Sequence, residues 1–218
     1  MHSVVTVACH SAALDRAVTY TALVPQAGTP PFAVLYQLHG MNDDHRAWLE
    51  KSNFLRHVDG LPLVVVTPSG ENSYYVGPWE KLVTEDIPAH VARTFRVREG
   101  RAAIGGLSMG GYGAIRLGLL YPHLYGSIFA HSSRLKESAD DHDVGWIAES
   151  ADRATLPALA FDCGVDDHLI DDSRRFHARL EALGLPHQYR EHAGAHTWDY
   201  WDEHVREALA WHVRVLGL

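Results

Sequence analysis

The segment Gly106-Leu107-Ser108-Met109-Gly110 decides how the rest of the chain is interpreted. It follows a short apolar run at 102–105 and precedes a helix-like run at 112–120. A G-x-S-x-G pattern between a strand and a helix is typical of a sharp turn that holds a serine at its tip. Glycines two places before and after the serine avoid a clash across such a turn. The alternative is a glycine-rich turn without chemistry, and partner residues elsewhere in the chain must decide between the two.

Bulk composition favours one globular domain spanning residues 1–218. Hydrophobic residues make up 46% of the chain and charged residues 21%, as in ordinary globular proteins. The formal net charge of -8 argues against nucleic acid or an anionic membrane as the main partner. Two cysteines are too few for a disulfide framework. The first residues lack the pattern of a signal peptide, and no apolar run is long enough to cross a bilayer, so we expect a cytoplasmic protein.

Strand-like and helix-like segments alternate along the chain. This order predicts an α/β fold with a mostly parallel central sheet and helices on both faces. The region between Ala130 and Leu156 is short, which predicts a minimal cap and an open cleft. The expected strands are 3–9, 18–24, 32–38, 61–67, 102–107, 127–130, 156–162 and 187–191. The expected helices are 46–58, 80–95 with a kink or break at Pro88, 111–120, 140–150, 171–183 and 197–215.

A serine nucleophile needs a base to take its proton. In hydrolases with this kind of turn the partners follow in the order serine, acid, histidine. His196 lies in a glycine-containing loop between the last predicted strand and the final helix, where it could reach Ser108. The competing histidines after the turn include His177, His204 and His212, which lie within predicted helices, and His187 and His192, which flank or end a predicted strand; the others are His123, His131, His142 and His168. The alternative role for His196 is helix capping or interface packing.

The acid is sought where the predicted strand 156–162 ends. Asp167 stands three residues after Gly164 and is the first choice, with Asp166 as the second. A carboxylate here would accept a hydrogen bond from the imidazole and fix its tautomer. Most aspartates in such turns merely cap helices or bond their own backbone, which keeps that alternative open.

The strand 32–38 runs into His39-Gly40-Met41, a position suited to an oxyanion hole. The backbone N–H groups of Met41 and Met109 are the candidate donors. A plain turn at His39-Gly40 is the competing interpretation. Further substrate-binding candidates are His39, Gly40, Tyr75, Trp79 and Trp198, although ordinary core packing would also explain aromatic residues there.

The sequence predicts no metal site and no cofactor. The 16 histidines are scattered, and a Cys-x-x-Cys pair is absent from the sequence. His192 and His196 are four residues apart, but Gly194 between them argues against a shared helix face.

Together these segments resemble the esterase family of α/β-hydrolases. That family includes esterase D (S-formylglutathione hydrolase), the tributyrin, feruloyl and enterochelin esterases and the mycolyl transferases, and the tributyrin-esterase branch is the most similar. The resemblance covers most of the chain. It rests on 35–40, 72–75, 105–114, 163–167 with 172–176, and 194–201. It implies Ser108 as nucleophile, Asp167 as acid and His196 as base, without a metal or organic cofactor in catalysis.

The expected function is a serine carboxylesterase that acts on small, short-acyl esters. Its partner would be a small-molecule ester rather than nucleic acid or membrane, with a homo-oligomer as an open alternative. A related acyltransferase and an S-formylglutathione thioesterase are alternative activities. A catalytically silent binding domain is the alternative from another class.

Overall fold

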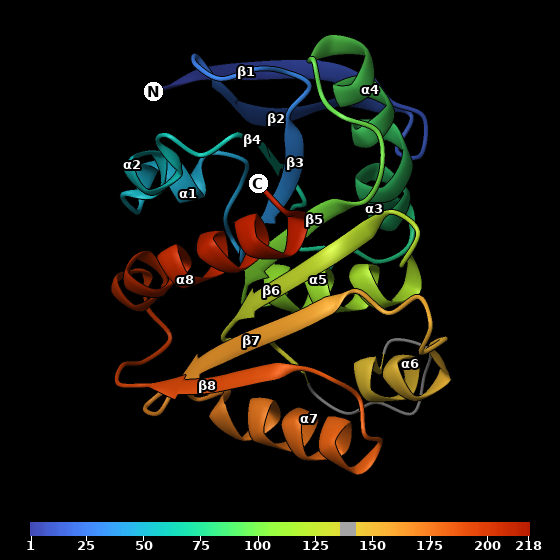
Figure 1. Ribbon diagram of the computed structural model, residues 1–218, viewed down its shortest axis with the longest axis vertical. Helices are drawn as coiled ribbons and strands as arrows, with labels where there is room; N and C mark the ends of the chain where they lie inside the picture. Colours follow the sequence, from blue (N-terminus) through green and yellow to red (C-terminus); the bar gives the residue numbers. More distant parts are fainter. Residues whose placement is uncertain (136–142) are drawn as a thin grey trace.

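An eight-stranded sheet forms the centre of the computed structural model, which describes residues 1–135 and 143–218 (Figure 1). The strand order is β1-β2-β4-β3-β5-β6-β7-β8. β1 and β2 form an antiparallel hairpin and β2 pairs antiparallel with β4, while the strands from β4 to β8 in this order are parallel. The strands are β1 His2–Ser11, β2 Arg16–Pro25, β3 Ala33–Leu38, β4 Leu63–Pro68, β5 Ala102–Leu107, β6 Tyr125–His131, β7 Ala158–Gly164 and β8 Gln188–His192.

Helices cover both faces of this sheet (Figure 1). They are α1 Ala47–Glu50, α2 Phe54–Val58, α3 Pro78–Lys81, the π-helical turn η1 Leu82–Asp86, α4 Ile87–Thr94, α5 Met109–Leu120, α6 Val144–Ser150, α7 Ile170–Ala182 and α8 Trp198–Leu216. One apolar cluster joins α1, α2 and α8 to the sheet, and a larger one joins α4 to α7 to the opposite face. This arrangement is an α/β-hydrolase fold, as the sequence predicted.

The inner strands are buried on both faces, which explains their continuous apolar runs. Every residue of β3 and of β4 is buried. Side chains alternate between the two clusters, so Val34 and Tyr36 belong to one while Leu35 belongs to the other.

The prediction of one helix over 46–58 is wrong. The segment forms two short helices, α1 and α2, separated at Lys51–Asn53. The Ser52 hydroxyl donates to the Trp48 carbonyl at 2.5 Å, and the Asn53 side chain donates to Asp202 of α8 at 2.7 Å. Side-chain hydrogen bonds of this kind compete with a continuous helix.

The predicted break near Pro88 is a π-helical turn. Proline has no N–H to donate to the carbonyl four residues earlier. Just before Pro88 the helix widens. The Ile87 N–H donates to the Leu82 carbonyl, five residues earlier, and not to the carbonyl four residues earlier. α3, η1 and α4 therefore replace one regular helix over 80–95.

The predicted helix over 140–150 is partly described. α6 begins at Val144, after Asp143 accepts a hydrogen bond from the Trp146 N–H at 2.8 Å. Residues 140–142 of that prediction lie outside the described ranges. The predicted minimal cap and open cleft also involve residues 136–142 and stay predictions.

Candidate active site

The carboxyl ends of four parallel strands meet at one edge of the sheet. His39-Gly40 follows β3, Ser108 follows β5, the Asp167 loop follows β7, and the His196 loop follows β8. In open α/β sheets this edge is where ligands bind. Every segment that the sequence singled out for chemistry therefore lies on the same edge.

Ser108 sits at the strained turn between β5 and α5. Its φ is 52° and its ψ is -115°, a conformation that L-residues rarely adopt. The Ser108 N–H donates to the His131 carbonyl at 2.9 Å, and the Ser108 carbonyl accepts from Tyr112 at 3.0 Å. The turn is thus held by the neighbouring strand β6 and by the first turn of α5.

Both glycines that flank the serine are required by space. A Cβ at Gly106 would lie 2.5 Å from the carbonyl oxygen of Gly110. A Cβ at Gly110 would lie 2.5 Å from the carbonyl oxygen of His39. The second contact also shows that the turn touches the end of β3, so the serine and the His39-Gly40 segment lie against each other.

A hydrogen-bond chain joins the three predicted residues. The Ser108 hydroxyl lies 3.0 Å from Nε2 of His196, and Nδ1 of His196 lies 2.8 Å from Oδ2 of Asp167. Asp167 is buried, while Ser108 and His196 are partly exposed. An imidazole that donates from Nδ1 to a carboxylate presents Nε2 as an acceptor. In this tautomer the serine hydroxyl donates to Nε2.

The carboxyl group of Asp167 is held in its charged form. Burial alone would raise its pKa, but hydrogen bonds from His196 and from the Leu169 N–H outweigh burial and lower the pKa below its ordinary value. The Leu169 N–H donates to the other carboxylate oxygen, Oδ1, at 2.8 Å.

Asp166, the second choice for the acid, is not the carboxylate that bonds to His196. Its side chain is exposed, and its N–H donates to the Gly194 carbonyl at 2.9 Å. This bond ties the acid loop to the loop that carries His196. The geometry therefore brings Asp167 beside the imidazole and gives Asp166 a backbone role.

The predicted oxyanion loop lies against the serine turn. A Cβ at Gly40 would lie 2.7 Å from Leu107 Cδ1 and 3.6 Å from Ser108 Cβ. Met41 comes next in the chain, and Met109 is the first residue of α5. Both backbone N–H groups thus belong to residues that border the Ser108 turn.

His39 and Tyr75 hold this loop from inside. The Gly70 N–H donates to Nε2 of His39 at 2.8 Å, and Nδ1 of His39 donates to the Gly40 carbonyl at 2.7 Å. The Tyr75 hydroxyl donates to the His39 carbonyl at 3.2 Å. Burial lowers the pKa of His39, which keeps the ring neutral and suited to this pairing.

Both residues are candidates for substrate binding from the sequence, but their side chains are buried. His39 is 1% exposed and Tyr75 is 0% exposed, so neither side chain faces solvent. Trp79 and Trp198 are partly exposed. Trp198 packs edge-on against Trp201, and Trp201 packs edge-on against His196 with ring centroids 4.9 Å apart. Of the aromatic candidates, Trp198 thus lies in the aromatic group around the base.

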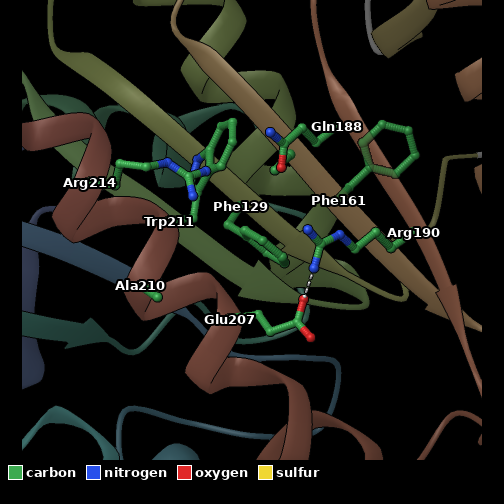
Figure 2. Close-up of a pocket in the computed structure, with 9 residues that line it drawn as sticks. Phe129, Phe161, Gln188, Arg190, Glu207, Ala210, Trp211 and Arg214 are labelled. Atoms are coloured by element: carbon green, nitrogen blue, oxygen red, sulfur yellow. Dashed lines mark hydrogen bonds and ion pairs between the residues drawn. The ribbon is translucent and has the colours of Figure 1, made fainter.

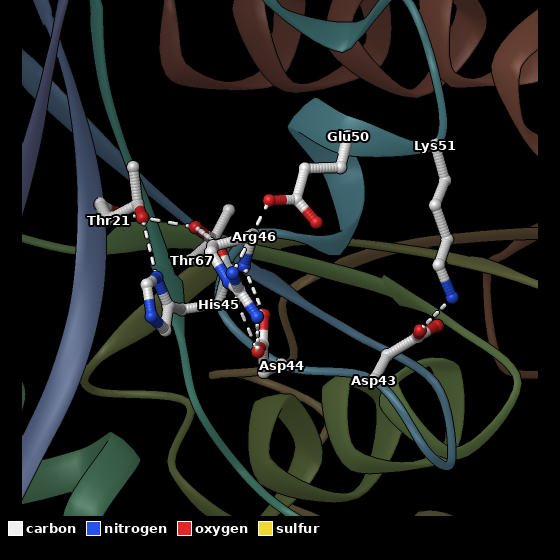
Figure 3. A network of polar contacts seen from close by, with 8 residues as sticks. All are labelled: Thr21, Asp43, Asp44, His45, Arg46, Glu50, Lys51 and Thr67. Atoms are coloured by element: carbon white, nitrogen blue, oxygen red, sulfur yellow. Dashed lines mark hydrogen bonds and ion pairs between the residues drawn. The ribbon is translucent and has the colours of Figure 1, made fainter.

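A polar network supports the chain that follows the oxyanion loop (Figure 3). Nδ1 of His45 lies 2.8 Å from the Thr21 hydroxyl on β2, and the Thr67 hydroxyl on β4 donates to the His45 carbonyl at 2.6 Å. Closer to the loop, the Asn42 N–H donates to Asn72 at 2.6 Å. These contacts attach residues 42–45 to neighbouring strands and loops, and so restrain the position of Met41.

A buried polar cluster around Asp162 lies next to Ser108 and the His196 loop, and no pattern in the sequence predicts it. Asp162 on β7 is 1% exposed. Its carboxylate accepts from Nδ1 of His131 at 2.9 Å and from the Tyr200 hydroxyl at 3.0 Å. The backbone carbonyl of His131 accepts a hydrogen bond from the Ser108 N–H. Tyr200 lies in the first turn of α8, next to the His196 loop. This cluster connects the three segments that carry Ser108, Asp167 and His196.

A separate pocket of about 150 Å³ opens between the strands β6 to β8 and α8 (Figure 2). Phe129 and Trp211 lie on its walls, and Arg190 donates to Glu207 across it at 2.6 Å. None of Ser108, Asp167 and His196 lines it. These three residues therefore lie away from this pocket, where the carboxyl ends of the parallel strands meet.

The fold and the strained serine turn define an α/β-hydrolase. The chain belongs to the esterase family, because residues 11–212 match the family model "Esterase", described as "Putative esterase". An acetyl esterase from Caldicellulosiruptor saccharolyticus is 28% identical, with 83% of each chain covered.

Solved structures agree with this assignment. A ferulic acid esterase has a TM-score of 0.87 at 26% identity, with 99% of both chains covered. An S-formylglutathione hydrolase from Staphylococcus aureus has a TM-score of 0.88 at 22% identity, covering 98% of this chain and 97% of that one, and supports the fold. The protein is thus a carboxylic ester hydrolase. No helix within the described ranges is long and apolar enough to span a membrane.

Proposed function

We propose that this protein is a serine carboxylesterase that hydrolyses small, short-acyl esters through an acyl-enzyme intermediate. Ser108 is the nucleophile, His196 the general base and acid, and Asp167 the residue that orients and stabilises the imidazole. The observation that carries the proposal is the continuous hydrogen-bond chain, with 3.0 Å from Ser108 to His196 and 2.8 Å from His196 to Asp167.

The first half of the reaction forms the acyl-enzyme. The Ser108 oxygen bonds to the ester carbonyl carbon while its proton moves to Nε2 of His196. The carbonyl π electrons move to oxygen, and the Met41 and Met109 N–H groups stabilise the resulting oxyanion. When the tetrahedral intermediate collapses, the bond to the alcohol oxygen breaks, and His196 gives its proton to the leaving alcohol.

The second half restores the enzyme. Water attacks the acyl carbon while His196 takes one of its protons. The bond to Ser108 then breaks, the serine oxygen recovers its proton from His196, and the carboxylic acid leaves. Asp167 stays ionised throughout, which its lowered pKa favours.

The proposed preference of this enzyme for short acyl groups is argued from its relatives. A relative described as an acetyl esterase supports a short acyl group, whereas a structural relative described as a ferulic acid esterase supports an aromatic one. We expect p-nitrophenyl acetate and butyrate to be hydrolysed faster than decanoate. The reverse order would overturn the short-acyl part of the proposal and leave ester hydrolysis standing.

The alternative activities are separated by the acceptor and by the substrate. An acyltransferase would pass the acyl group to an added alcohol at the expense of hydrolysis, which product analysis measures. A thioesterase would prefer S-formylglutathione over acetate esters. The experiment that tests the proposal itself is the Ser108→Ala variant, which should lose hydrolysis of every ester while keeping the folded circular dichroism spectrum.

A further inference from the structure

A second imidazole, that of His168, lies beside His196 and takes no part in the hydrogen-bond chain of the triad. His168 follows Asp167 directly, and its ring centroid lies 4.7 Å from that of His196. Nδ1 of His168 lies 3.5 Å from Oδ1 of Asp167. The His168 side chain is 70% exposed, whereas the Asp167 side chain is fully buried. The acid and the base are thus bordered by an imidazole that solvent reaches freely.

These three residues present the donor atoms of a zinc site. One ligand atom from each of Asp167, His168 and His196 lies within 4.8 Å of the other two. Imidazole nitrogens and a carboxylate oxygen are ligands that Zn²⁺ accepts, with bonds of about 2.0–2.2 Å. Tetrahedral bonds of this length place neighbouring donors about 3.4 Å apart. Nδ1 of His196 and Oδ2 of Asp167 are 2.8 Å apart, and Nδ1 of His168 and Oδ1 of Asp167 are 3.5 Å apart, so binding requires the exposed His168 and the partly exposed His196 to rotate.

We propose that Asp167, His168 and His196 bind Zn²⁺ and that the bound ion switches the esterase off. The inference rests on the proposed function, because it assigns a regulatory ligand to the same triad. The ion would bind where the His196 Nδ1 proton now bridges to Asp167, with His168 as the third protein ligand and water as the fourth.

The inhibition follows from proton positions on His196. Without metal, the Nδ1 proton faces Asp167 and the Nε2 lone pair accepts the Ser108 proton. When Zn²⁺ takes the Nδ1 lone pair, the proton from Nδ1 moves to Nε2 in the neutral ring. No proton is gained or lost overall. Nε2 then donates toward Ser108 and cannot accept from it, so the base is blocked.

The affinity for Zn²⁺ depends on His168. Asp167 and His196 alone offer two ligands, and structural or catalytic zinc sites use three or four protein ligands. The buried Asp167 carboxylate, whose two oxygens face His196 and the Leu169 N–H, adds a negatively charged ligand for a cation. Removing His168 should therefore weaken zinc binding without removing any member of the triad.

The chain contains a second group of potential ligands that serves as a control. His192, His204 and Glu207 also present donor atoms within 4.8 Å of one another, at β8 and α8. The His192 and His204 rings are stacked with centroids 4.1 Å apart, and Arg190 donates to Glu207 at 2.6 Å. A guanidinium beside the carboxylate opposes a cation there. Zinc bound at this group would not touch the His196 tautomer.

The test titrates p-nitrophenyl acetate hydrolysis with ZnCl₂, with each rate divided by the metal-free rate of the same variant. Wild type should be inhibited, and EDTA should restore its rate. His168→Ala should need at least about tenfold more zinc for half inhibition, because loss of a hydrogen-bond partner of a metal ligand already costs that much affinity and His168 is a direct ligand. His192→Ala should match wild type. Zinc-insensitive wild type, or equal sensitivity of His168→Ala, would overturn the inference.

A second readout does not depend on turnover. In a Ser108→Ala/His192→Ala background, Co²⁺ should give the visible absorption bands of a tetrahedral site, and a further His168→Ala change should remove them. Unchanged bands would contradict the site. Failure of the proposed function is seen separately, as absent hydrolysis and absent Ser108 labelling in metal-free wild type. Hydrolysis that is normal but insensitive to zinc rejects this inference alone.

Discussion

The Ser108 hydroxyl lies 3.0 Å from Nε2 of His196, although 88 positions separate the two residues in the chain. The parallel sheet produces this proximity, because β5 and β8 both end at the same edge. β7 lies next to β8 and delivers Asp167 to the far side of the imidazole. Three side chains from three separate segments are thus aligned in one hydrogen-bond chain.

The two neighbouring aspartates should differ sharply in their effect on turnover. Asp167→Asn should lower kcat by about 10³- to 10⁴-fold, because the amide favours the wrong imidazole tautomer. Asp166→Asn should stay within about threefold of wild type, since its side chain is exposed and His196 bonds to Asp167 instead. Steady-state kinetics on p-nitrophenyl acetate measures both. A larger loss for Asp166→Asn would assign the acid role to that residue.

The buried Asp162 cluster should matter for stability as well as for turnover. Tyr200→Phe removes the hydroxyl that donates to Asp162, leaving a buried carboxylate with one donor fewer. We expect about 1–3 kcal/mol lower free energy of unfolding and a reduced kcat with KM nearly unchanged. Urea unfolding and kinetics measure these.

Tyr189→Phe is the matched control for Tyr200→Phe. Its hydroxyl donates to Glu191 at an exposed position on the edge strand β8. The control should lose about 0.5 kcal/mol or less. Equal losses in the two variants would show that the Asp162 cluster has no special role.

Gly110, two residues after Ser108, should be required for activity. In Gly110→Ala the new Cβ would meet the His39 carbonyl oxygen at 2.5 Å, so the serine turn and the oxyanion loop must separate. We expect hydrolysis to fall at least about 100-fold, because a shift of 1 Å costs that much. In the control Gly126→Ala, at the amino end of β6, the nearest atom to the new Cβ is Arg101 Cβ at 3.3 Å, a much smaller overlap, and activity should survive. Wild-type turnover in Gly110→Ala would contradict the steric account.

His212 should make the protein less stable in acid. Burial, with a smaller contribution from nearby His131, lowers the pKa of His212 to about 3, whereas an unfolded histidine has a pKa of about 6.5. The unfolded chain therefore binds a proton that the folded chain refuses. The stabilising effect is complete above about pH 6.5 and is lost as the pH falls toward about 3.

The expected size is about 2 kcal/mol of lost stability between pH 7.5 and pH 5.0 from this group. Urea unfolding of wild type and of His212→Gln at the two pH values measures it. The variant should lose about 2 kcal/mol less than wild type over this interval. Parallel losses would show that His212 does not stay neutral in the folded protein.

Local patterns predicted the fold well where a single cause controls the structure. The buried runs at 32–38 and 61–67 form β3 and β4, and the G-x-S-x-G turn follows β5. The prediction over 46–58 was wrong because the Ser52 hydroxyl bonds to the Trp48 carbonyl and the Asn53 side chain bonds to Asp202, which lies far along the chain in α8. Distant contacts of this kind leave no local pattern in the sequence.

The site was predictable to the same extent. The order of the motifs along the chain predicted that Ser108, Asp167 and His196 lie together. In the structure their side chains are joined by two hydrogen bonds. The inward orientation of His39 and Tyr75 depends on the Gly70 loop, and the Asp162 cluster depends on strand register. Both are tertiary relations between residues that look unremarkable one at a time.

The central claim is that Ser108 is an activated nucleophile. The most direct measurement is mass spectrometry of the metal-free protein after reaction with a fluorophosphonate. We predict one adduct on the peptide that contains Ser108 and no adduct in Ser108→Ala. Hydrolysis should fall in proportion to the labelled fraction and be lost completely when every molecule is labelled. A folded wild-type protein that stays unlabelled, or carries the adduct on another residue while it hydrolyses esters, would contradict the account.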